Sequence, residues 1–260
     1  MSKPAYIDTH CHLNLVDAFE STAAVLKRAR LAGVAQMVVI GIDIPTSRLA
    51  VQLAEKHENL YATVGIHPND CLKAPKDWER EILNLLDHPK VVAVGETGLD
   101  NYWKDTPPEV QKRFFRDHLD LALASGLPAI IHNREADESI LEVVLEHGNQ
   151  RGVFHCWPGD WNLAKPLLDK GYHISFTGNI TFKKSEVIQD VAARMPLGRL
   201  MLETDSPFLT PAPHRGTKPN EPHYLPFIAQ RIAELRGIDV ADLAAATTAN
   251  AVEFFGLKRD

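Results

Sequence analysis

Residues 91–134, VVAVGETGLDNYWKDTPPEVQKRFFRDHLDLALASGLPAIIHNR, contain one complete strand–helix–strand unit. The apolar run Val91–Gly95 predicts a buried strand, and the amphipathic stretch Glu109–Ala124 predicts a helix. A second apolar run, Ala129–Ile131, follows after a short connection. This order of elements favours two parallel strands joined by the helix that lies between them in the sequence.

Both ends of this helix carry signals of their own. Thr106 and Glu109 have the spacing of a capping box, and Pro107 between them suits the first helical position. Gly126 stands where the helix should end, because glycine readily adopts the left-handed conformation of a helix terminus. The sequence therefore predicts a helix held between these two signals.

The same alternation of apolar runs and amphipathic stretches extends along the whole chain, and glycines at 33, 148 and 171 mark further helix ends. The predicted strands are Ala5–Thr9, Gln36–Ile40, Leu60–Gly65, Val91–Gly95, Ala129–Ile131, Gly152–His155, Tyr172–Phe176 and Leu200–Thr204. The predicted helices are Phe19–Ala32, Arg48–Glu55, Glu79–Leu86, Glu109–Ala124, Glu138–Glu146, Leu163–Lys170 and Val187–Ala193.

Eight strand–helix units in 260 residues match the size of a (β/α)₈ barrel, the TIM barrel. An open, doubly wound sheet would show the same alternation, but it would collect its polar residues at one switch point. Here polar residues follow nearly all of the predicted strands, which favours the barrel. We expect one domain over residues 1–260, with the proline-rich segment Pro207–Pro222 as a long loop after the eighth strand.

The composition is that of an ordinary globular protein, with 45% hydrophobic and 24% charged residues. Three cysteines are too few for a disulfide framework and favour a reducing cytoplasm. No apolar run approaches the roughly 18 residues of a membrane span, so we expect no membrane association. The net charge of -6 argues against a broad basic surface for nucleic acid, and no sequence feature marks an obligate protein partner.

Polar side chains at the strand ends predict a metal centre. His10 and His12 end the first predicted strand, and because side chains alternate along a strand they share one face. Two neighbouring imidazoles suit a divalent metal ion. The ends of the fourth, fifth, sixth and eighth strands add four more ligand-type residues, which are Glu96, His132, His155 and Asp205.

Six nitrogen and oxygen ligands are too many for one tetrahedral ion, and they suit two ions that share a carboxylate. Glu96 directly follows an apolar run, where a buried carboxylate requires a cation or strong hydrogen-bond donors. The alternative is that all six are independent, satisfied polar residues. Cys11 and Cys156 are predicted to be small buried side chains rather than ligands, because strand alternation turns them away from the histidines.

Further residues are predicted to lie around this centre and to contact a substrate. Arg134 follows His132 by two positions, and its planar guanidinium could bind a phosphate through two hydrogen bonds. The remaining candidates for substrate contact are His67, Lys183, His214 and Arg215, each with the alternative of a packing or solvated residue. Three aromatic residues, Tyr102, Trp103 and Trp157, could stack on bases or pack as lids.

Successive motifs along nearly the whole chain resemble those of the TatD-type metal-dependent hydrolases, within the amidohydrolase-like barrels. Thr97 and Trp157 differ from the residues common in that family, and neither is at a ligand position. The motifs are Asp8–Leu13, Gly65–Pro68, Gly95–Asp100, Phe154–Trp157, Gly178–Lys183, Glu203–Pro207, Pro213–Gly216 and Asn220–Pro222.

The resemblance implies a barrel with two divalent ions and the activity of a deoxyribonuclease. By position, one ion would be held by His10, His12, Glu96 and Asp205, and the other by Glu96, His132 and His155, with Glu96 bridging. Imidazole ligands favour Zn²⁺, Mn²⁺ or Fe²⁺ by their softness, whereas Mg²⁺ is common in assays of the family. Asp205 would also accept a proton from the attacking water, so Asp205 and Glu96 are the predicted catalytic residues.

Three functions follow as hypotheses. The first is a metal-dependent nuclease that cleaves phosphodiester bonds, acting as an exonuclease at single-stranded DNA ends. Two ions opposed by two carboxylates retain a positive surplus, which together with Arg134 favours this anionic substrate. The second is a hydrolase of carboxylic esters or amides, including an aminoacyl-tRNA deacylase. The third, a metal-binding protein without turnover, is disfavoured by the complete ligand set.

Overall fold

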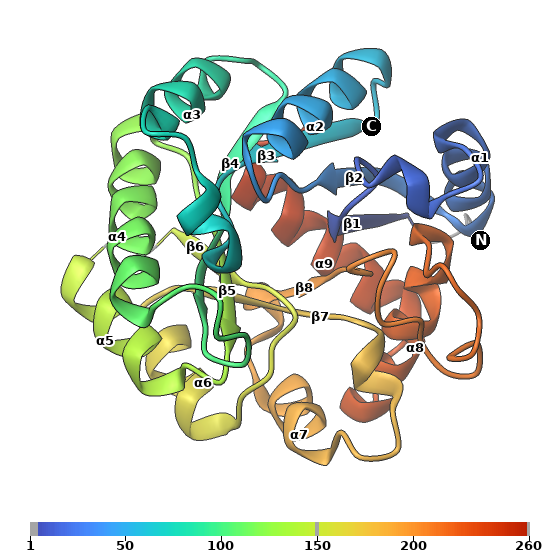
Figure 1. The fold of residues 1–260 in the computed structure, drawn as a ribbon. Helices are drawn as coiled ribbons and strands as arrows, with labels where there is room; N and C mark the ends of the chain where they lie inside the picture. Colours follow the sequence, from blue (N-terminus) through green and yellow to red (C-terminus); the bar gives the residue numbers. More distant parts are fainter. Residues whose placement is uncertain (1–4, 149–150, 259–260) are drawn as a thin grey trace.

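The computed structural model describes residues 5–148 and 151–258, and it confirms the predicted barrel. Eight parallel strands are hydrogen-bonded in the order in which they occur along the chain. Helices surround them on the outside (Figure 1). The strands are β1 (Tyr6–Cys11), β2 (Val34–Val39), β3 (Leu60–Val64), β4 (Val91–Asp100), β5 (Ala129–Arg134), β6 (Gly152–Phe154), β7 (His173–Phe176) and β8 (Leu200–Leu202).

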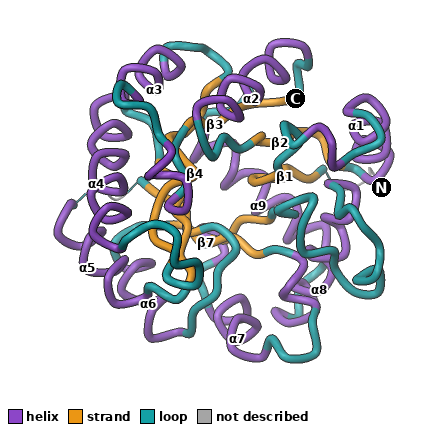
Figure 2. The backbone as a smooth tube through the Cα atoms, in the orientation of Figure 1, coloured by secondary structure: helices purple, strands orange, loops and turns teal. Residues whose placement is uncertain are grey.

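The α-helices follow the strands in alternation, as the tube in Figure 2 makes plain. They are α1 (Thr22–Ala32), α2 (Ile44–Lys56), α3 (Trp78–Leu86), α4 (Pro108–Ser125), α5 (Asp137–His147), α6 (Trp161–Asp169), α7 (Glu186–Arg194), α8 (Leu225–Arg236) and α9 (Val240–Phe255). Short 3₁₀ helices are η1 (Val16–Ala18), η2 (Pro68–Lys73), η3 (Gly178–Thr181), η4 (Leu197–Arg199) and η5 (Pro222–Tyr224). None of the helices in the described ranges is both long enough and apolar enough to span a membrane.

The barrel closes where the first strand meets the segment after the last one. The backbone N–H of Asp205 donates to the carbonyl of His10 at 2.9 Å. The carboxylate of Asp8 accepts from the backbone N–H of Thr204 at 2.9 Å and from its hydroxyl at 2.5 Å. These hydrogen bonds bring the strand end that carries His10 beside Asp205.

The other end of the barrel is filled by the C-terminal helix. Phe254 and Phe255 of α9 belong to the same buried cluster as Ile7, Val38 and other residues that line the interior of the barrel. A second, larger cluster lies between the strands and the surrounding helices. Apolar side chains thus fill the amino-terminal end of the barrel, and the polar side chains lie at the carboxyl ends of the strands.

Three details differ from the sequence-based expectations. The prediction of a capping box at Thr106 is wrong. Helix α4 begins at Pro108, and the hydroxyl of Thr106 donates instead to the carbonyl of Asn69 at 3.2 Å. Strand β4 continues beyond Gly95 because residues 97–100 pair with β5. Helices α8 and α9 were not among the predicted helices, and they follow the long loop after β8.

Candidate metal centre

Glu96 lies at the centre of the ligand-type residues, and its two carboxylate oxygens face different groups. Its Oε1 atom lies 2.8 Å from Nδ1 of His132 and 2.8 Å from Nε2 of His155. These two nitrogens are 3.1 Å apart. We call Glu96, His132 and His155 the first cluster, and their ligand atoms are close enough together to hold one metal ion.

The other oxygen of Glu96 faces the histidines of β1. Its Oε2 atom lies 3.4 Å from Nε2 of His10 and 3.9 Å from Nε2 of His12. Asp205 approaches the same nitrogens, with Oδ1 3.6 Å from His10 and 3.3 Å from His12. We call His10, His12, Glu96 and Asp205 the second cluster. The six predicted ligands therefore converge: His132 and His155 lie at one oxygen of Glu96, and His10 and His12, which also face Asp205, lie at the other.

The close approach of the β4 and β5 backbones fixes the position of Glu96. A side chain on Gly95 would meet the carbonyl oxygen of Ile130 at 2.6 Å, and the φ of Gly95 is +137°. Only glycine fits such a position without strain, because it has no Cβ. The tight contact between β4 and β5 brings Glu96 against His132, which comes from β5.

Asp205 occupies a strained backbone conformation. Its φ of +53° lies in the left-handed region, which costs a residue with a side chain roughly 1–2 kcal/mol. Backbone strain of this kind collects at functional sites, where the surrounding structure holds it in place. Here the hydrogen bond from Asp205 N–H to the carbonyl of His10 holds the carboxylate beside His10 and His12.

The electrostatics of the centre keep the carboxylates ionised. Burial alone would raise the pKa of the Glu96 carboxyl. The charge of His155 and hydrogen bonds from His10 and His132 outweigh that effect and hold this pKa well below its usual value. For Asp205, burial also raises the pKa, and the hydrogen bond from His12 helps to bring it below the ordinary value. Both side chains are therefore negative at neutral pH.

The donor set fits divalent metal ions. The Nε2 atoms of His10 and His12 lie 3.2 Å apart, and each faces a carboxylate oxygen. The pKa of His155 is raised well above its ordinary value, because the attraction of Glu96 and Glu203 outweighs the effect of burial. Imidazole nitrogens and carboxylate oxygens crowded in this way match the ligands of Zn²⁺, Mn²⁺ and Fe²⁺.

Two further carboxylates support the first cluster from behind. Asp100 Oδ2 lies 3.2 Å from Nε2 of His132, and Glu203 Oε1 lies 3.5 Å from Nδ1 of His155. Glu203 is itself held by the hydroxyl of Ser175, which donates to its Oε2 at 2.5 Å. Such outer carboxylates orient a metal-binding histidine and make it a better ligand.

Sequence analysis assigned no role to these two carboxylates, although a signal was present. Glu203 precedes Asp205 by two positions, and Asp100 follows Glu96 by four. Even spacings along a strand place side chains on one face, so both residues could have been expected beside the ligands.

His67 lies beside the first cluster, with Nε2 3.6 Å from Glu96 Oε1. Its Nδ1 accepts a hydrogen bond from the backbone N–H of Asn69 at 3.2 Å, so the ring proton resides on Nε2. Burial and the neighbouring His132 lower the pKa of His67 to about 4, which keeps the ring neutral. The predicted substrate residue is thus a neutral donor next to the centre.

The other predicted substrate residues lie on the rim. The guanidinium of Arg134 is exposed and stacks over the ring of Tyr102 at 3.9 Å. Arg215 stacks over Phe182 at 4.0 Å, and both line a cavity of about 650 Å³ together with Phe208 and other residues of the loop after β8.

The remaining candidates are placed differently. The ring of His214 packs against the rings of Tyr224 and Phe227, with centroid distances of 5.1 and 4.8 Å. Lys183 is exposed on the segment after η3. Trp157 is fully buried, so of its two alternatives the structure favours packing.

The cysteines stand apart from the ligand atoms. Cys11 is buried, and its thiol donates to the carbonyl of Val38 at 3.4 Å. Cys156 is only partly buried, contrary to expectation, and its sulfur lies 3.4 Å from the hydroxyl of Thr177. Among the described residues, neither cysteine belongs to a group that could hold a metal ion.

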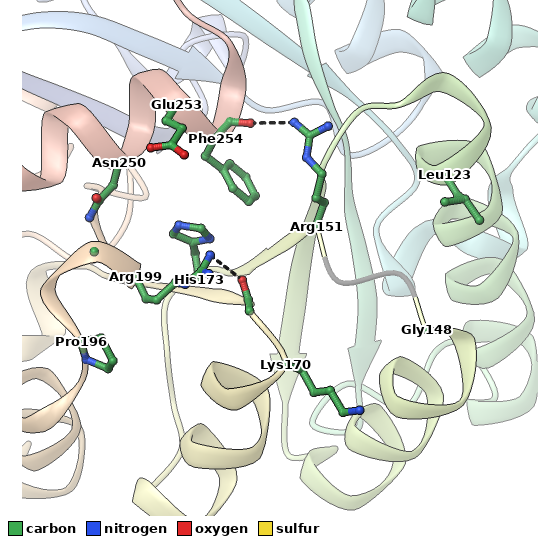
Figure 3. A pocket seen from close by; sticks show the side chains of 12 residues that line it. Leu123, Gly148, Arg151, Lys170, His173, Pro196, Arg199, Asn250, Glu253 and Phe254 are labelled. Atoms are coloured by element: carbon green, nitrogen blue, oxygen red, sulfur yellow. Dashed lines mark hydrogen bonds between the residues drawn. The ribbon is translucent and has the colours of Figure 1, made fainter.

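Figure 3 shows the residues that line a second cavity. This cavity lies at the opposite end of the barrel and shares no residue with the two clusters. It has a volume of about 710 Å³ and is lined by Arg151, His173 and Arg199, among others. These residues stand just before or at the start of β6, β7 and β8, whereas the predicted ligands stand at strand ends. Arg199 donates to the carbonyl of Gly171 at 2.9 Å and so supports a chain turn there.

Comparisons with known proteins agree with this arrangement. A family model described as TatD related DNase matches residues 7–256. The metal-dependent hydrolase YabD of Bacillus subtilis is 39% identical over 250 residues, which covers 95% of this chain and 98% of that protein. The metal-dependent hydrolase TatD of Mycobacterium tuberculosis is 36% identical, with 96% and 98% covered. The crystal structure of YJJV, a TatD homolog from Escherichia coli K12, superposes with a TM-score of 0.92 at 30% identity, covering 99% of this chain and 100% of that one.

Proposed function

Because this chain belongs to the TatD-related DNase family, we propose that it is a metal-dependent hydrolase that cleaves phosphodiester bonds at single-stranded DNA ends. Relatives that match almost the whole chain are named metal-dependent hydrolases. The observation that carries the proposal is the position of Glu96, whose two oxygens face two separate groups of imidazole nitrogens. A shared carboxylate of this kind is a hallmark of two-ion sites, in which the ions lie about 3.5–4 Å apart.

The chemistry divides between the ions and the protein. Two divalent ions bound there would polarise a phosphoryl oxygen and lower the pKa of a water molecule. Asp205 Oδ1 faces His10 and His12, so Oδ2 is the atom proposed to accept the proton of the attacking water. The Asp205 side chain is 13% exposed, which leaves it accessible from the substrate side.

Two residues are proposed to hold the scissile phosphate. His67 carries its ring proton on Nε2, which faces the first cluster, and a neutral donor can hydrogen-bond a phosphate oxygen. Arg134 lies at the end of β5, two residues beyond His132, and its guanidinium can bind a second phosphate oxygen. These contacts would orient the phosphorus atom for attack.

The charge of the whole centre favours an anionic substrate less strongly than a count of the metal ligands alone suggests. Asp100 and Glu203 lie behind His132 and His155, so four carboxylates rather than two oppose the ions. Attraction of a phosphodiester then depends more on the cations of the rim. Arg215 and Lys218 line the cavity beside the loop after β8, and its lining contains no acidic residue.

This balance keeps hydrolysis of carboxylic esters or amides, including aminoacyl-tRNA ends, as a second candidate. A nearly neutral centre can activate water against an uncharged carbonyl as well as against a phosphodiester. A metal-binding role without turnover is disfavoured, because all six predicted ligands converge and the strained Asp205 is held over them.

The test uses protein reconstituted separately with Mg²⁺, Mn²⁺ and Zn²⁺. Each preparation receives 3′-labelled single-stranded DNA, the matching blunt duplex, and ester and amide substrates. Shortened DNA products that vanish in Asp205→Asn support the proposal. The matched control is Asp190→Asn, which alters an exposed aspartate paired with Arg194 on α7 and should retain activity. Turnover restricted to the ester or amide substrates would contradict the nuclease proposal and favour the second candidate.

A further inference from the structure

Two large aromatic side chains stand exposed at the rim beside the first cluster. Tyr102 is 46% exposed and Trp103 is 50% exposed, on the loop between β4 and α4. Their rings are perpendicular, at 88°, with centroids 5.0 Å apart. Isolated exposed hydrophobic residues are common on protein surfaces, but two adjacent aromatic rings form a contiguous apolar surface.

A cation completes this surface. The guanidinium carbon of Arg134 lies 3.9 Å from the ring centroid of Tyr102 and 6.0 Å from that of Trp103. The guanidinium therefore lies over the ring of Tyr102 and, at a greater distance, over the ring of Trp103. We call Tyr102, Trp103 and Arg134 the aromatic ledge.

One carboxylate joins the loop of the ledge to the first cluster. Asp100 Oδ1 accepts from the backbone N–H groups of Tyr102 and Trp103 at 3.0 and 3.1 Å. Its other oxygen, Oδ2, lies 3.2 Å from Nε2 of His132. One side chain thus contacts both the loop of the ledge and a predicted metal ligand, so the two are close neighbours.

The backbone also joins the two sides of the ledge. The N–H of Asn101 donates to the carbonyl of Arg134 at 2.8 Å, and the Asn101 side chain donates to the carbonyl of Glu135 at 3.0 Å. A surface ordered before binding loses little conformational entropy when a ligand arrives. These hydrogen bonds therefore fix the backbone that carries the three side chains of the ledge.

We propose that the aromatic ledge binds an unpaired nucleobase next to the phosphodiester held at the metal centre. The inference depends on the proposed nuclease function and deepens it by assigning the base-binding part of the site. Bases of single strands stack on aromatic rings and on arginine planes, and this stacking tolerates every base because each has a π face. Bases within a duplex are already stacked on both faces, so the ledge selects unpaired ends.

The first experiment compares Tyr102→Ala/Trp103→Ala with the wild type on two single-stranded oligonucleotides. One oligonucleotide is intact. The other is a series of strands, each of which lacks the base at one position near the end that is cut. The double variant should raise the KM for the intact strand by roughly 5- to 100-fold with kcat nearly unchanged. On the oligonucleotide that lacks the bound base, the wild type and the variant should have equal KM values.

The matched control is Trp161→Ala. Trp161 also carries an arginine over its ring, Arg194 at 4.3 Å, but its surroundings include Asp160 and Asp190 rather than predicted ligands. This variant should leave the KM for DNA unchanged. Melting temperatures of all variants, together with the conservative Trp103→Phe, which should keep most of the affinity, separate loss of stacking from loss of folding.

A second measurement does not depend on turnover. In metal-free Asp205→Asn protein, oligothymidylate should quench tryptophan fluorescence, and Trp103→Phe in that background should remove the quenching. If the wild type cuts DNA but base removal at every position leaves its KM unchanged, the ledge proposal fails while the nuclease function stands. If the wild type cuts no DNA and no quenching occurs, both proposals fail. Quenching without cutting would overturn the nuclease function and keep the ledge as a nucleobase site.

Discussion

The carboxylate of Asp8 accepts two hydrogen bonds from Thr204, one from the backbone N–H and one from the hydroxyl, across the closure of the barrel. Asp8 lies two residues before His10, and Thr204 directly precedes Asp205. The pair therefore fixes the distance between the two halves of the second cluster. Asp8 is fully buried, so these hydrogen bonds have no competition from water.

Replacing Asp8 tests this relationship. Asp8→Ala should lower the free energy of unfolding by about 3 kcal/mol, because it leaves the buried N–H of Thr204 without an acceptor. Asp8→Asn should cost less than about 1.5 kcal/mol, since the amide oxygen can still accept that hydrogen bond and Thr204 Oγ1 can accept from the amide. Urea unfolding of the three proteins measures both values. Equal stability of the alanine and asparagine variants would show that the hydrogen bonds do not hold the closure.

Removal of the shared carboxylate should affect both clusters at once. Glu96→Gln keeps the size of the side chain but removes the negative charge that faces the four histidines. We expect a loss of bound metal in both clusters and a fall in hydrolysis on the order of 10³-fold, consistent with several kcal/mol of metal-assisted stabilisation. Metal analysis and calorimetric titration give the stoichiometry. A variant that still bound two ions per chain with wild-type affinity would contradict the bridging role.

Glu203→Gln should weaken metal binding chiefly at the first cluster. Glu203 Oε1 lies 3.5 Å from Nδ1 of His155, and the same carboxylate is close enough to His10 to form, with these two histidines, a group that could hold a metal ion. Loss of such an outer carboxylate typically lowers metal affinity by about 10–100-fold. Activity should return to near wild-type kcat when enough metal is added. Ser175→Ala, which removes only a hydroxyl that donates to Glu203, is the milder comparison.

The pH dependence of the unfolding free energy should report on His118, a histidine that is not among the predicted metal ligands. Its Nδ1–H donates to the carbonyl of Phe114 at 2.7 Å, and its Nε2 accepts from the N–H of Ile66 at 3.0 Å. Burial lowers the pKa of His118 to about 4, although the hydrogen bond to Phe114 acts in the opposite direction. The folded protein therefore keeps this ring neutral. The unfolded chain takes up the proton near pH 6.5, and stability is therefore lost as the pH falls from about 6.5 to about 4.

His118→Gln removes this contribution. Between pH 7 and pH 5 the wild type should lose about 2 kcal/mol more unfolding free energy than the variant. His67 and His173, whose pKa values burial also lowers to about 4, are present in both proteins and cancel in the comparison. Denaturant unfolding at the two pH values measures the difference. Parallel losses in the two proteins would mean that His118 is already protonated in the folded state at pH 5.

The sequence predicted the barrel and the convergence of the ligand-type residues because both follow from simple rules. Strand alternation placed His10 and His12 on one face, and parallel strands bring their carboxyl ends to the same end of the barrel. The same rule places Asp100, four residues after Glu96, on the ligand face, but spacing alone does not reveal that its partner is His132 of another strand. The pairing of residues 97–100 with β5, which extends β4, is likewise a tertiary contact.

Local signals failed where a distant partner competed for the same group. Thr106 has the spacing of a capping residue, but its hydroxyl bonds the carbonyl of Asn69, which is remote in sequence. Trp157 follows a strand end as an exposed stacking residue would, yet it is fully buried with its ring against Phe154 at 5.9 Å. In both cases packing that the sequence does not reveal overrides the local pattern.

The two clusters draw on different parts of the chain, and this has a consequence for the order in which they form. The first cluster comes from the consecutive strands β4, β5 and the end of β6, whereas the second joins β1 to the segment after β8. During synthesis, every ligand of the first cluster has been made once His155 is added, while the second waits for Asp205. A chain that ended before β8 would contain His10, His12 and Glu96 but would lack Asp205, the proposed proton acceptor. In the proposed two-ion centre, the segment from Cys156 to Asp205 therefore completes the second cluster and supplies the group that would activate water.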